Sequence, residues 1–321
     1  MSTLAWIIGR GGLLGSSLVH TVSSRFELWQ GPTQPFAWGD AKTLMQQLQH
    51  AAGVFRERAE AHDSWAIFWA AGRAVVSSTE AELSVDTEVF RSFLESVAQA
   101  RPGGRGAVFF ASSAGGVYGN AQDRPLTERS ACVTISAYGC FKQEQERVLQ
   151  AFSANTGISS LVGRISNLYG PNQNLAKPQG LISQLSRAFI FGQPAHVYVP
   201  LDTIRDYIYA DDCARAVTVA VNELLAASES EARLRIFASE QPASISFLVR
   251  LLEQIGKRRV RMIQARTGAQ LLQPRTLTFQ SLYPRIAPRT SLLEGVKRVH
   301  EHQLALLRQG TLPFPALKVG S

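Results

Sequence analysis

A glycine-rich turn near the N-terminus constrains the fold more than any other feature of the sequence. The turn reads Gly9-Arg10-Gly11-Gly12-Leu13-Leu14-Gly15. An apolar run over residues 4–8 precedes it and predicts a buried strand, and residues 16–23 predict a helix after it. Gly9 then permits a tight turn, Gly12 lets the backbone approach a pyrophosphate, and Gly15 permits close helix–strand packing. Because the helix N-terminus offers N–H groups to phosphates, the turn predicts a dinucleotide site; a purely structural turn is the alternative.

Strand-like and helix-like stretches alternate through the first two thirds of the chain, which is typical of a parallel sheet covered by helices on both faces. We expect strands over residues 4–8, 26–29, 65–70, 107–111 and 159–164, and helices over residues 16–23, 44–52, 83–100, 138–152 and 181–191. Residues 205–209 predict a strand that returns to the first sheet. The sequence therefore predicts an α/β fold with a Rossmann-type, doubly wound parallel sheet. That domain would span residues 1–170, with 204–220 returning to it, and residues 171–203 and 221–321 would mainly form a smaller C-terminal substrate-binding lobe.

The charge of the chain favours an anionic partner. Its 321 residues carry a net charge of +8, and the pI is near 9.7. The basic residues are scattered apart from Lys257-Arg258-Arg259, and motifs that read grooves or stack bases are missing, so we expect no nucleic-acid partner. A substrate that bears a diphosphate fits the same charge.

The sequence indicates no membrane, disulfide or metal site. No apolar stretch approaches the roughly 18 residues that span a bilayer, and residues 4–8 are too short for a signal-peptide core. Cys132, Cys140 and Cys213 are widely spaced, without the spacing of paired ligands. The histidines lack metal-ligand spacing apart from His300 and His302, a pair that we expect on a solvated helix face. We therefore expect no metal, no membrane insertion and a cytoplasmic location.

Tyr138 and Lys142 lie one helical turn apart in an expected helix, which places both side chains on one face. Free tyrosine titrates near ~10, and a nearby ammonium together with the positive nicotinamide ring of a bound dinucleotide favours the phenolate and lowers its pKa toward neutrality. Tyr138 could then take a hydroxyl proton as a hydride leaves the same carbon, or return that proton in a reduction. A solvated helix face explains the same spacing when the pair is taken alone.

A second segment makes the catalytic interpretation more specific. It ends an expected strand and reads Ala111-Ser112-Ser113-Ala114-Gly115-Gly116-Val117-Tyr118-Gly119. Together with the glycine turn and the Tyr138–Lys142 pair, it resembles the extended short-chain dehydrogenase/reductase family of NAD-dependent nucleotide-sugar epimerases and dehydratases, and most of all its UDP-sugar 4-epimerase-like members. The resemblance implies that Tyr138, Lys142 and Ser113 are catalytic and that Lys142 holds the nicotinamide ribose. The usual Ser/Thr position falls at Ala114, so Ser113 serves only if the loop is shifted by one residue.

The resemblance also implies a cofactor site. The cofactor is NAD, with NADP not excluded, because the acidic residue that normally closes the second strand and binds the ribose hydroxyls is missing and Gln30 stands nearest its place. Trp38-Gly39-Asp40 resembles the segment that brings an aspartate to the adenine edge, and a helix N-cap is the alternative role for Asp40. The implied cofactor-binding residues are Gly9, Gly11, Gly12, Leu13, Leu14, Gly15, Asp40, Ala70, Ala71, Gly72 and Lys142.

Segments in the second half resemble the substrate-binding part of the same family. Residues 164–171 resemble its R-x-x-N-x-Y-G-P motif, so Asn167 would bind the diphosphate region; a loop-capping asparagine is the alternative. Residues 205–212 resemble R-D-Y-I-Y-V-D-D, so Arg205 would bind the diphosphate bidentately. Asp211 or Asp212 would cap the next helix. Either Arg266 or Arg275 would supply a second phosphate contact.

One departure from the family narrows the chemistry. Relatives that eliminate water place an Asp-Glu pair just before V-Y-G, and related decarboxylases place a glutamate there, whereas this chain has Gly115-Gly116. The resemblance therefore implies 4-epimerisation or 4-ketoreduction of a nucleotide-diphosphate sugar. The alternative hypothesis is a catalytically weak dinucleotide-binding sensor or partner-binding protein of the same fold, motivated by Ala114 and Gln30. A homodimer through the helices over 83–100 and 138–152 is a further expectation.

Overall fold

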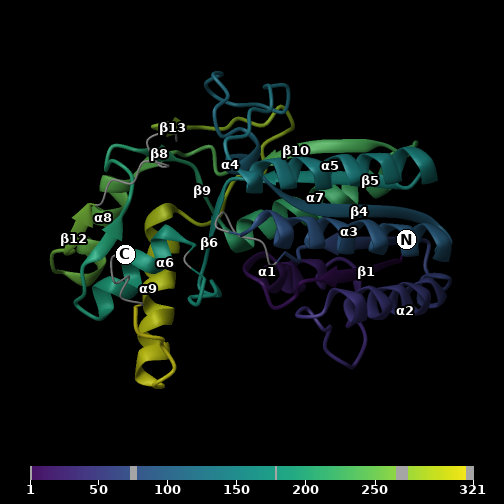
Figure 1. Ribbon diagram of the computed structural model, residues 1–321, viewed down its shortest axis with the longest axis horizontal. Helices are drawn as coiled ribbons and strands as arrows, with labels where there is room; N and C mark the ends of the chain where they lie inside the picture. The colour runs from purple at the N-terminus through teal and green to yellow at the C-terminus, as the bar shows by residue number, and fades with distance from the viewer. Residues whose placement is uncertain (1, 73–77, 178, 265–273, 316–321) are drawn as a thin grey trace.

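A six-stranded parallel sheet forms the centre of the larger half of the molecule (Figure 1). The computed structural model describes residues 2–72, 78–177, 179–264 and 274–315. The strands lie in the order β10-β5-β4-β3-β1-β2, and all neighbouring pairs are parallel. Their bounds are Thr3–Ile8 (β1), Glu27–Trp29 (β2), Ser64–Trp69 (β3), Arg105–Ser113 (β4), Ser159–Ile165 (β5) and Ala232–Phe237 (β10). The strand order reverses at β1 and β3, and ligands of such sheets bind outside the carboxyl ends at this switch point.

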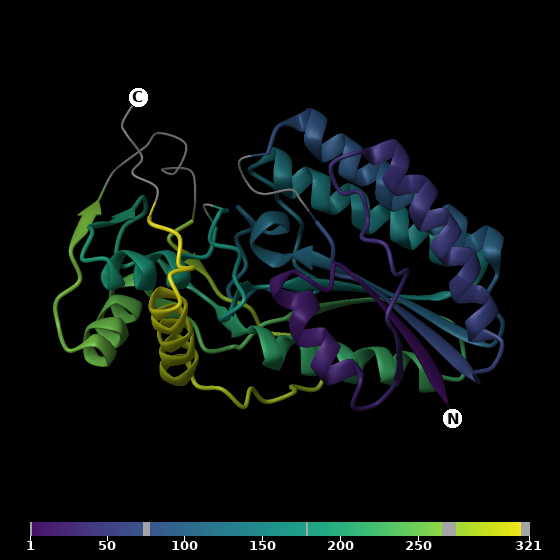
Figure 2. The same ribbon diagram turned by 90° about the horizontal axis from the view of Figure 1, so that it is seen from below.

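Helices cover both faces of this sheet, which confirms the predicted Rossmann-type fold. Figure 2 shows α2, α3 and α5 on one side of the strands and α1 and α7 on the other. Their bounds are Leu13–Val22 (α1), Ala41–Ala59 (α2), Glu80–Ala100 (α3), Ala137–Thr156 (α5) and Ala210–Ala226 (α7). Successive side chains of β1 point to opposite faces of the sheet: Trp6 packs with α2 and α3, whereas Ile7 packs with α1 and α7. Because both faces are buried, β1 is a continuous apolar run rather than an alternating one.

A smaller lobe is built around three helices, α6 (Leu181–Ile190), α8 (Ile245–Gly256) and α9 (Leu292–Arg308). Short strands, all outside the large sheet, accompany these helices. They are Asn167–Tyr169 (β6), Ala195–Val197 (β7), Ile204–Arg205 (β8), Tyr207–Tyr209 (β9), Ala243–Ser244 (β11), Met262–Gln264 (β12) and Thr276–Leu277 (β13). They pair as β6 with β9, β7 with β12, and β8 between β11 and β13. The short helix α4 (Ala114–Val117) follows β4.

The expected strand over residues 205–209 does not join the large sheet, which corrects the prediction. Asp206 divides it into β8 and β9, which belong to different small sheets. The Asp206 carboxylate is fully buried and accepts hydrogen bonds from the hydroxyls of Ser166 and Ser239 and from the Ser239 N–H. Since a buried carboxylate must be paired, this site fixes the chain at the division. The chain returns to the Rossmann domain through helix α7 instead of through a strand. The sixth strand of the large sheet is β10, which lies in the range that the sequence analysis gives to the substrate-binding lobe.

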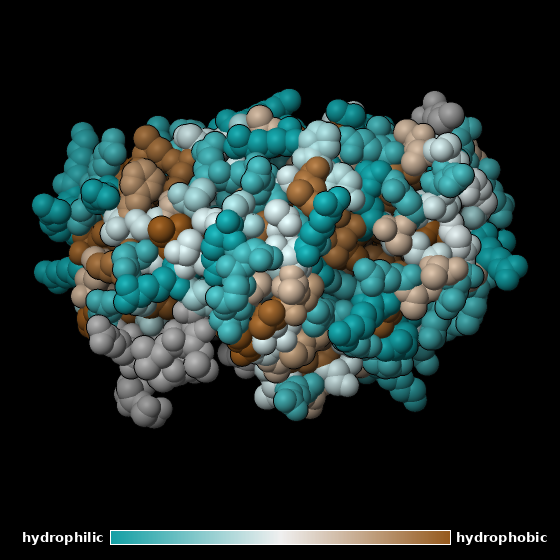
Figure 3. Space-filling view, turned by 90° about the horizontal axis from the view of Figure 1, so that it is seen from above, coloured by the Kyte–Doolittle hydropathy of each residue, from teal (hydrophilic) through white to brown (hydrophobic). Residues whose placement is uncertain are grey.

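Carboxylates connect distant segments between the two halves. Glu128 accepts hydrogen bonds from the Ile236 and Leu282 N–H groups and from the Ser281 hydroxyl. Asp212 accepts hydrogen bonds from the backbone of Arg289 and Thr290 in the segment that leads into α9. On the face seen from above, hydrophobic residues form small patches among hydrophilic ones (Figure 3). No helix in the described ranges has the length and apolarity needed to cross a bilayer.

Candidate active site

The glycine turn lies at the switch point, pressed between β1 and the end of β3. A methyl group on Gly15 would lie 2.0 Å from the Gly9 carbonyl oxygen, and one on Gly9 would lie 2.6 Å from the Ala71 nitrogen. Gly9 also has a φ of +92°, a conformation that favours glycine. These contacts place Ala70 and Ala71 directly against the turn, and their part in binding a cofactor stays a prediction.

The other side of the turn is open. Gly11 and Gly12 are exposed, and a methyl group on Gly11 would meet nothing within 4 Å. Gly12 is the N-cap of α1 and offers no side chain to the first N–H groups of the helix. This arrangement fits the pyrophosphate of a dinucleotide, which would receive N–H groups and the positive end of the helix dipole. Leu14 points into the core beneath, so it could contact a cofactor only through its backbone.

Two further predicted cofactor residues lie at the edges of this site. Asp40 is the N-cap of α2, and its carboxylate accepts hydrogen bonds from the N–H groups of Lys42 and Thr43. The alternative role given to it by the sequence is therefore confirmed, and an adenine contact stays a prediction. Gly72 is exposed, and its carbonyl accepts a hydrogen bond of 3.5 Å from Lys177, which comes from beyond β6.

Tyr138 lies in the first turn of α5, half-buried, with its hydroxyl near that of Ser113. Ser136 fixes the start of this helix because its hydroxyl accepts a hydrogen bond from the Gly139 N–H. Burial raises the pKa of Tyr138 to about 12, although the nearby Ser113 hydroxyl acts in the opposite direction. The sequence predicts that Lys142 and a bound nicotinamide together lower this pKa; Lys142 alone does not lower it, so the neutral phenol is the stable form here.

Lys142 lies one turn deeper and is 6% exposed. Its ammonium donates hydrogen bonds to the Ala111 carbonyl at 3.2 Å and to the Gln145 side chain at 3.3 Å. Burial lowers the pKa of Lys142 to about 8, against the opposing effect of Asp86 and Glu146. These interactions hold the ammonium at the end of β4, below the phenol.

Ser113, rather than residue 114, brings a hydroxyl to Tyr138. Ser113 is the last residue of β4 and the N-cap of α4, where its Oγ accepts a hydrogen bond from the Gly116 N–H at 3.2 Å. Ala114 is fully buried in a cluster with Tyr118. A methyl group on Gly116 would lie 3.3 Å from both the Ser113 Oγ and the Tyr138 ring, so glycine here leaves room for the phenol.

A buried ion pair between Arg164 and Glu146 lies next to the site, and the sequence analysis does not predict it. Arg164, at the end of β5, donates from Nε and Nη2 to both carboxylate oxygens of Glu146, and their side chains are 6% and 3% exposed. Ser112 donates to Glu146 at 2.5 Å, and Arg164 donates to the Tyr118 hydroxyl at 2.6 Å. Glu146 lies one helical turn after Lys142 in α5, and this spacing is the sequence feature from which its place near the site could be predicted. The pair fixes α5 against the ends of β4 and β5.

The predicted substrate residues lie where the small strands meet. The Asn167 side chain is exposed and donates to the Asp206 carbonyl at 2.8 Å. Arg205 is half-buried and donates to the carbonyls of Ile204 at 2.9 Å and Arg275 at 3.3 Å. Burial lowers the pKa of Arg205 from its usual value. The structure thus brings Arg205 and Arg275 together.

Two other predictions for this half have different outcomes. Arg266 lies outside the described residues. Asp211 and Asp212 lie in the first turn of α7, but neither caps it, because the N-cap is Tyr209 and has no side-chain cap. Asp211 accepts a hydrogen bond from Ser17 of α1 instead, and Asp212 binds the segment before α9.

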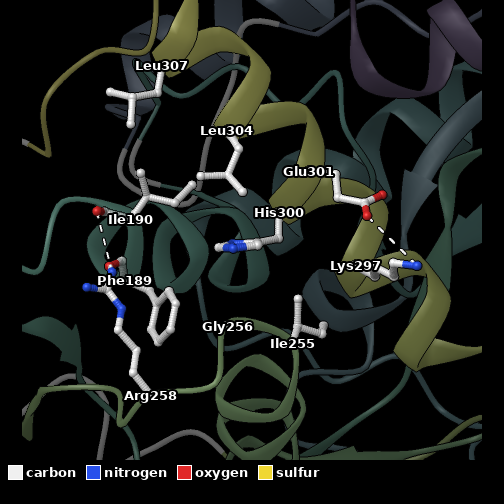
Figure 4. A pocket seen from close by; sticks show the side chains of 10 residues that line it. All are labelled: Phe189, Ile190, Ile255, Gly256, Arg258, Lys297, His300, Glu301, Leu304 and Leu307. Carbon is white, nitrogen blue, oxygen red and sulfur yellow. Dashed lines mark hydrogen bonds and ion pairs between the residues drawn. The ribbon is translucent and has the colours of Figure 1, made fainter.

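A separate cavity of about 470 Å³ opens between α6, α8 and α9 (Figure 4). Its walls include Phe189, Ile255, Leu304 and Leu307, and His300 lies among them with a hydrogen bond of 3.1 Å to Ser186 inside the lobe. None of the predicted site residues lines it. The described ranges contain no group of three or more His, Cys, Asp or Glu side chains that could hold a metal ion.

Comparisons with known proteins show the family to which the chain belongs. Residues 5–232 match the model of the NAD dependent epimerase/dehydratase family. The chain is 30% identical over 115 residues to a putative UDP-glucose 4-epimerase of Methanocaldococcus jannaschii, an alignment that covers 36% of this chain and 38% of that protein. It is 33% identical over 109 residues to a dTDP-4-dehydro-6-deoxyglucose reductase of Escherichia coli, with 34% of each chain covered.

The alignments with these two curated relatives thus span little more than a third of their length. A likeness over the whole chain comes from structure. The fold matches the crystal structure of a UDP-glucose 4-epimerase from Thermotoga maritima with UDP-glucose, with a TM-score of 0.73 and 21% identity over 96% of this chain and 100% of the other.

Proposed function

Because the chain belongs to the NAD-dependent epimerase/dehydratase family, we propose that it is a nucleotide-sugar 4-epimerase or 4-ketoreductase in which Tyr138 acts as acid and base at the C4 oxygen. The contact between Tyr138 and Ser113 is the observation that carries the proposal. It joins two hydroxyls at the carboxyl ends of the strands, beside the open glycine turn, where ligands of this kind of sheet bind. Lys142 lies one turn below them.

These residues can handle a proton at one sugar oxygen. A bound nicotinamide supplies the acceptor and donor of the hydride at C4. Ser113 donates a hydrogen bond to the C4 oxygen and orients it, and Tyr138 takes the hydroxyl proton or returns it. For Tyr138 to accept a proton near neutral pH its pKa must fall from about 12, and a positive charge beside the phenol has that effect.

The second half of the molecule supplies cations for the nucleotide diphosphate. Arg205 is the main candidate, because its guanidinium can bind a phosphate bidentately and its burial strengthens such a contact. Arg275 lies beside it, although its side chain forms an exposed ion pair with Asp202 at 3.0 Å. Asn167, exposed at the start of β6, would bind the same diphosphate region.

Elimination and decarboxylation are not favoured by the residues near the phenol. Gly115 is exposed, and a methyl group on it would meet nothing within 4 Å, so an acidic side chain has space there but the chain supplies none. Gly116, its neighbour, faces the Tyr138 ring. The position that moves a proton to or from C5 and C6 in relatives therefore has no acid or base here.

The test compares the protein with its Tyr138→Phe variant on a panel of nucleotide-diphosphate sugars and their 4-keto derivatives. Turnover should fall by roughly a hundredfold or more, the usual size of a general acid–base contribution, while dinucleotide affinity is retained. Tyr283→Phe, on a half-buried tyrosine that packs against Arg233 and Arg235, is the matched control and should leave turnover unchanged.

The cofactor requirement of the reaction distinguishes an epimerase from a ketoreductase. Conversion at catalytic amounts of enzyme without added cofactor identifies an epimerase, whereas a stoichiometric need for reduced cofactor identifies a ketoreductase. If Tyr138→Phe turns over a true substrate as fast as the parent, the catalytic role is wrong. A dinucleotide-binding protein without any turnover on the panel would be the sensor of the alternative hypothesis.

A further inference from the structure

The arginine inside the glycine turn is held against the end of β2. Arg10 donates from Nη1 to the Gln30 carbonyl at 2.6 Å and from Nη2 to the Gln30 Oε1 at 2.5 Å. Gln30 is the first residue after β2, and Arg10 follows the last residue of β1 by two positions. One side chain therefore spans the carboxyl ends of two neighbouring strands.

This is the place where a dinucleotide-binding sheet distinguishes its cofactors. In such sheets an acidic residue at the end of the second strand accepts hydrogen bonds from the adenosine ribose, or an arginine nearby accommodates a 2′-phosphate. Here the neutral Gln30 follows the end of β2, and the Arg10 guanidinium is hydrogen-bonded to it. A carboxylate at this position would repel a phosphate, whereas the amide does not.

The carboxylates closest in sequence are engaged elsewhere. Glu27, on β2, is paired with His62 at 3.1 Å, and Asp40 caps α2. Among the described residues, no ion pair joins Arg10 to an acidic side chain. Its positive charge is thus not compensated by a neighbouring carboxylate, and it is only partly buried.

We propose that Arg10, oriented by Gln30, binds the 2′-phosphate of NADP(H), so that this chain prefers NADP(H) to NAD(H) within a family named for NAD. A guanidinium has five N–H donors in a planar fork, and two of them suffice for Gln30, which leaves donors for phosphate oxygens. The two bonds to Gln30 hold the fork in place before the ligand arrives, which reduces the entropy lost on binding. The inference rests on the dinucleotide site of the proposed function.

Binding, not turnover, tests this preference. The protein is freed of bound nucleotide and titrated with NADPH and with NADH at one ionic strength, with nicotinamide fluorescence or calorimetry as the readout. The parent should bind NADPH about tenfold to a hundredfold more tightly than NADH, as expected for hydrogen bonds between charged groups. Arg10→Ala should remove that difference by weakening NADPH alone, and Gln30→Asp should reverse it.

Arg25→Ala is the matched control, because Arg25 is an exposed arginine in the turn just before β2. It should leave both dissociation constants unchanged. Equal or tighter binding of NADH by the parent overturns the inference and leaves the proposed function standing. Binding of neither dinucleotide would overturn the proposed function itself. If Arg10→Ala weakens the binding of NADPH and NADH equally, the arginine stabilises the turn and does not bind the 2′-phosphate, and the inference is wrong.

Discussion

The buried ammonium of Lys142 should make the stability of the protein depend on pH in a defined way. Transfer of this side chain into the interior lowers its pKa from 10.5 to about 8. A pKa unit corresponds to about 1.4 kcal/mol, so the charged form costs about 3 kcal/mol when both the folded and the unfolded chains are protonated. Lys142→Met removes this cost.

The sign follows from the number of protons that each state binds. Between about pH 8 and pH 10.5 the unfolded chain keeps the Lys142 proton while the folded protein has lost it. Stability then rises with pH, because the unfolded state binds more protons. The cost is fully present below pH 8 and disappears above pH 10.5. Relative to Lys142→Met, the parent should therefore gain about 2–3 kcal/mol between pH 7 and pH 10.

Urea denaturation at pH 7, 8, 9 and 10 measures this difference without bound nucleotide. Titrations common to both proteins cancel in the comparison. The control is Lys42→Met, because Lys42 is an exposed lysine in the first turn of α2 and should give a difference that does not change with pH. A constant difference between the parent and Lys142→Met over the whole range would refute the burial argument.

Three further predictions concern packing and assembly. Gly15→Ala should abolish dinucleotide binding in a calorimetric titration and lower the free energy of unfolding by about 1–3 kcal/mol, because its methyl group would lie 2.0 Å from the Gly9 carbonyl oxygen. Glu146→Gln leaves the buried Arg164 without a charged partner and should cost about 3–5 kcal/mol in urea denaturation, against at most about 1 kcal/mol for Glu144→Gln on a half-exposed glutamate of the same helix; equal effects would contradict this. Sedimentation equilibrium should show a dimer formed through α3 and α5, and a monomer at all concentrations would rule it out.

The parts of the fold that the sequence predicts best are those with one dominant local signal. β1 and β3 are nearly continuous apolar runs, and the glycines after β1 permit the tight turn and the close helix–strand packing that the structure shows. β10 was missed because Arg233 and Arg235 interrupt its apolar pattern. The structure shows why they are tolerated: β10 is an edge strand, and both arginines pair with Glu223 and pack on Tyr283.

The candidate site shows the same limit at the level of single residues. The spacing of Tyr138 and Lys142 predicts a shared helix face, yet it cannot give the depth at which the ammonium is buried or the carbonyl that it binds. The choice between Ser113 and Ala114 depended on where β4 ends, and a boundary shift of one residue lies below what a sequence pattern resolves. The partners of Asp206 come from distant segments, so no local pattern indicates them.

Helix α7 and strand β10 belong to the larger half but follow part of the smaller lobe in the sequence. Cleavage of the chain at a single position therefore cannot separate the two halves. A fragment that stops at residue 170 would leave the far edge of β5 without its partner β10. It would also uncover the layer where Val217 and Leu224 pack on Phe109 and Leu161. A ribosome must therefore synthesise α6 and the chain as far as β10 before the larger half can close its core, and the two halves are expected to become stable as one cooperative unit.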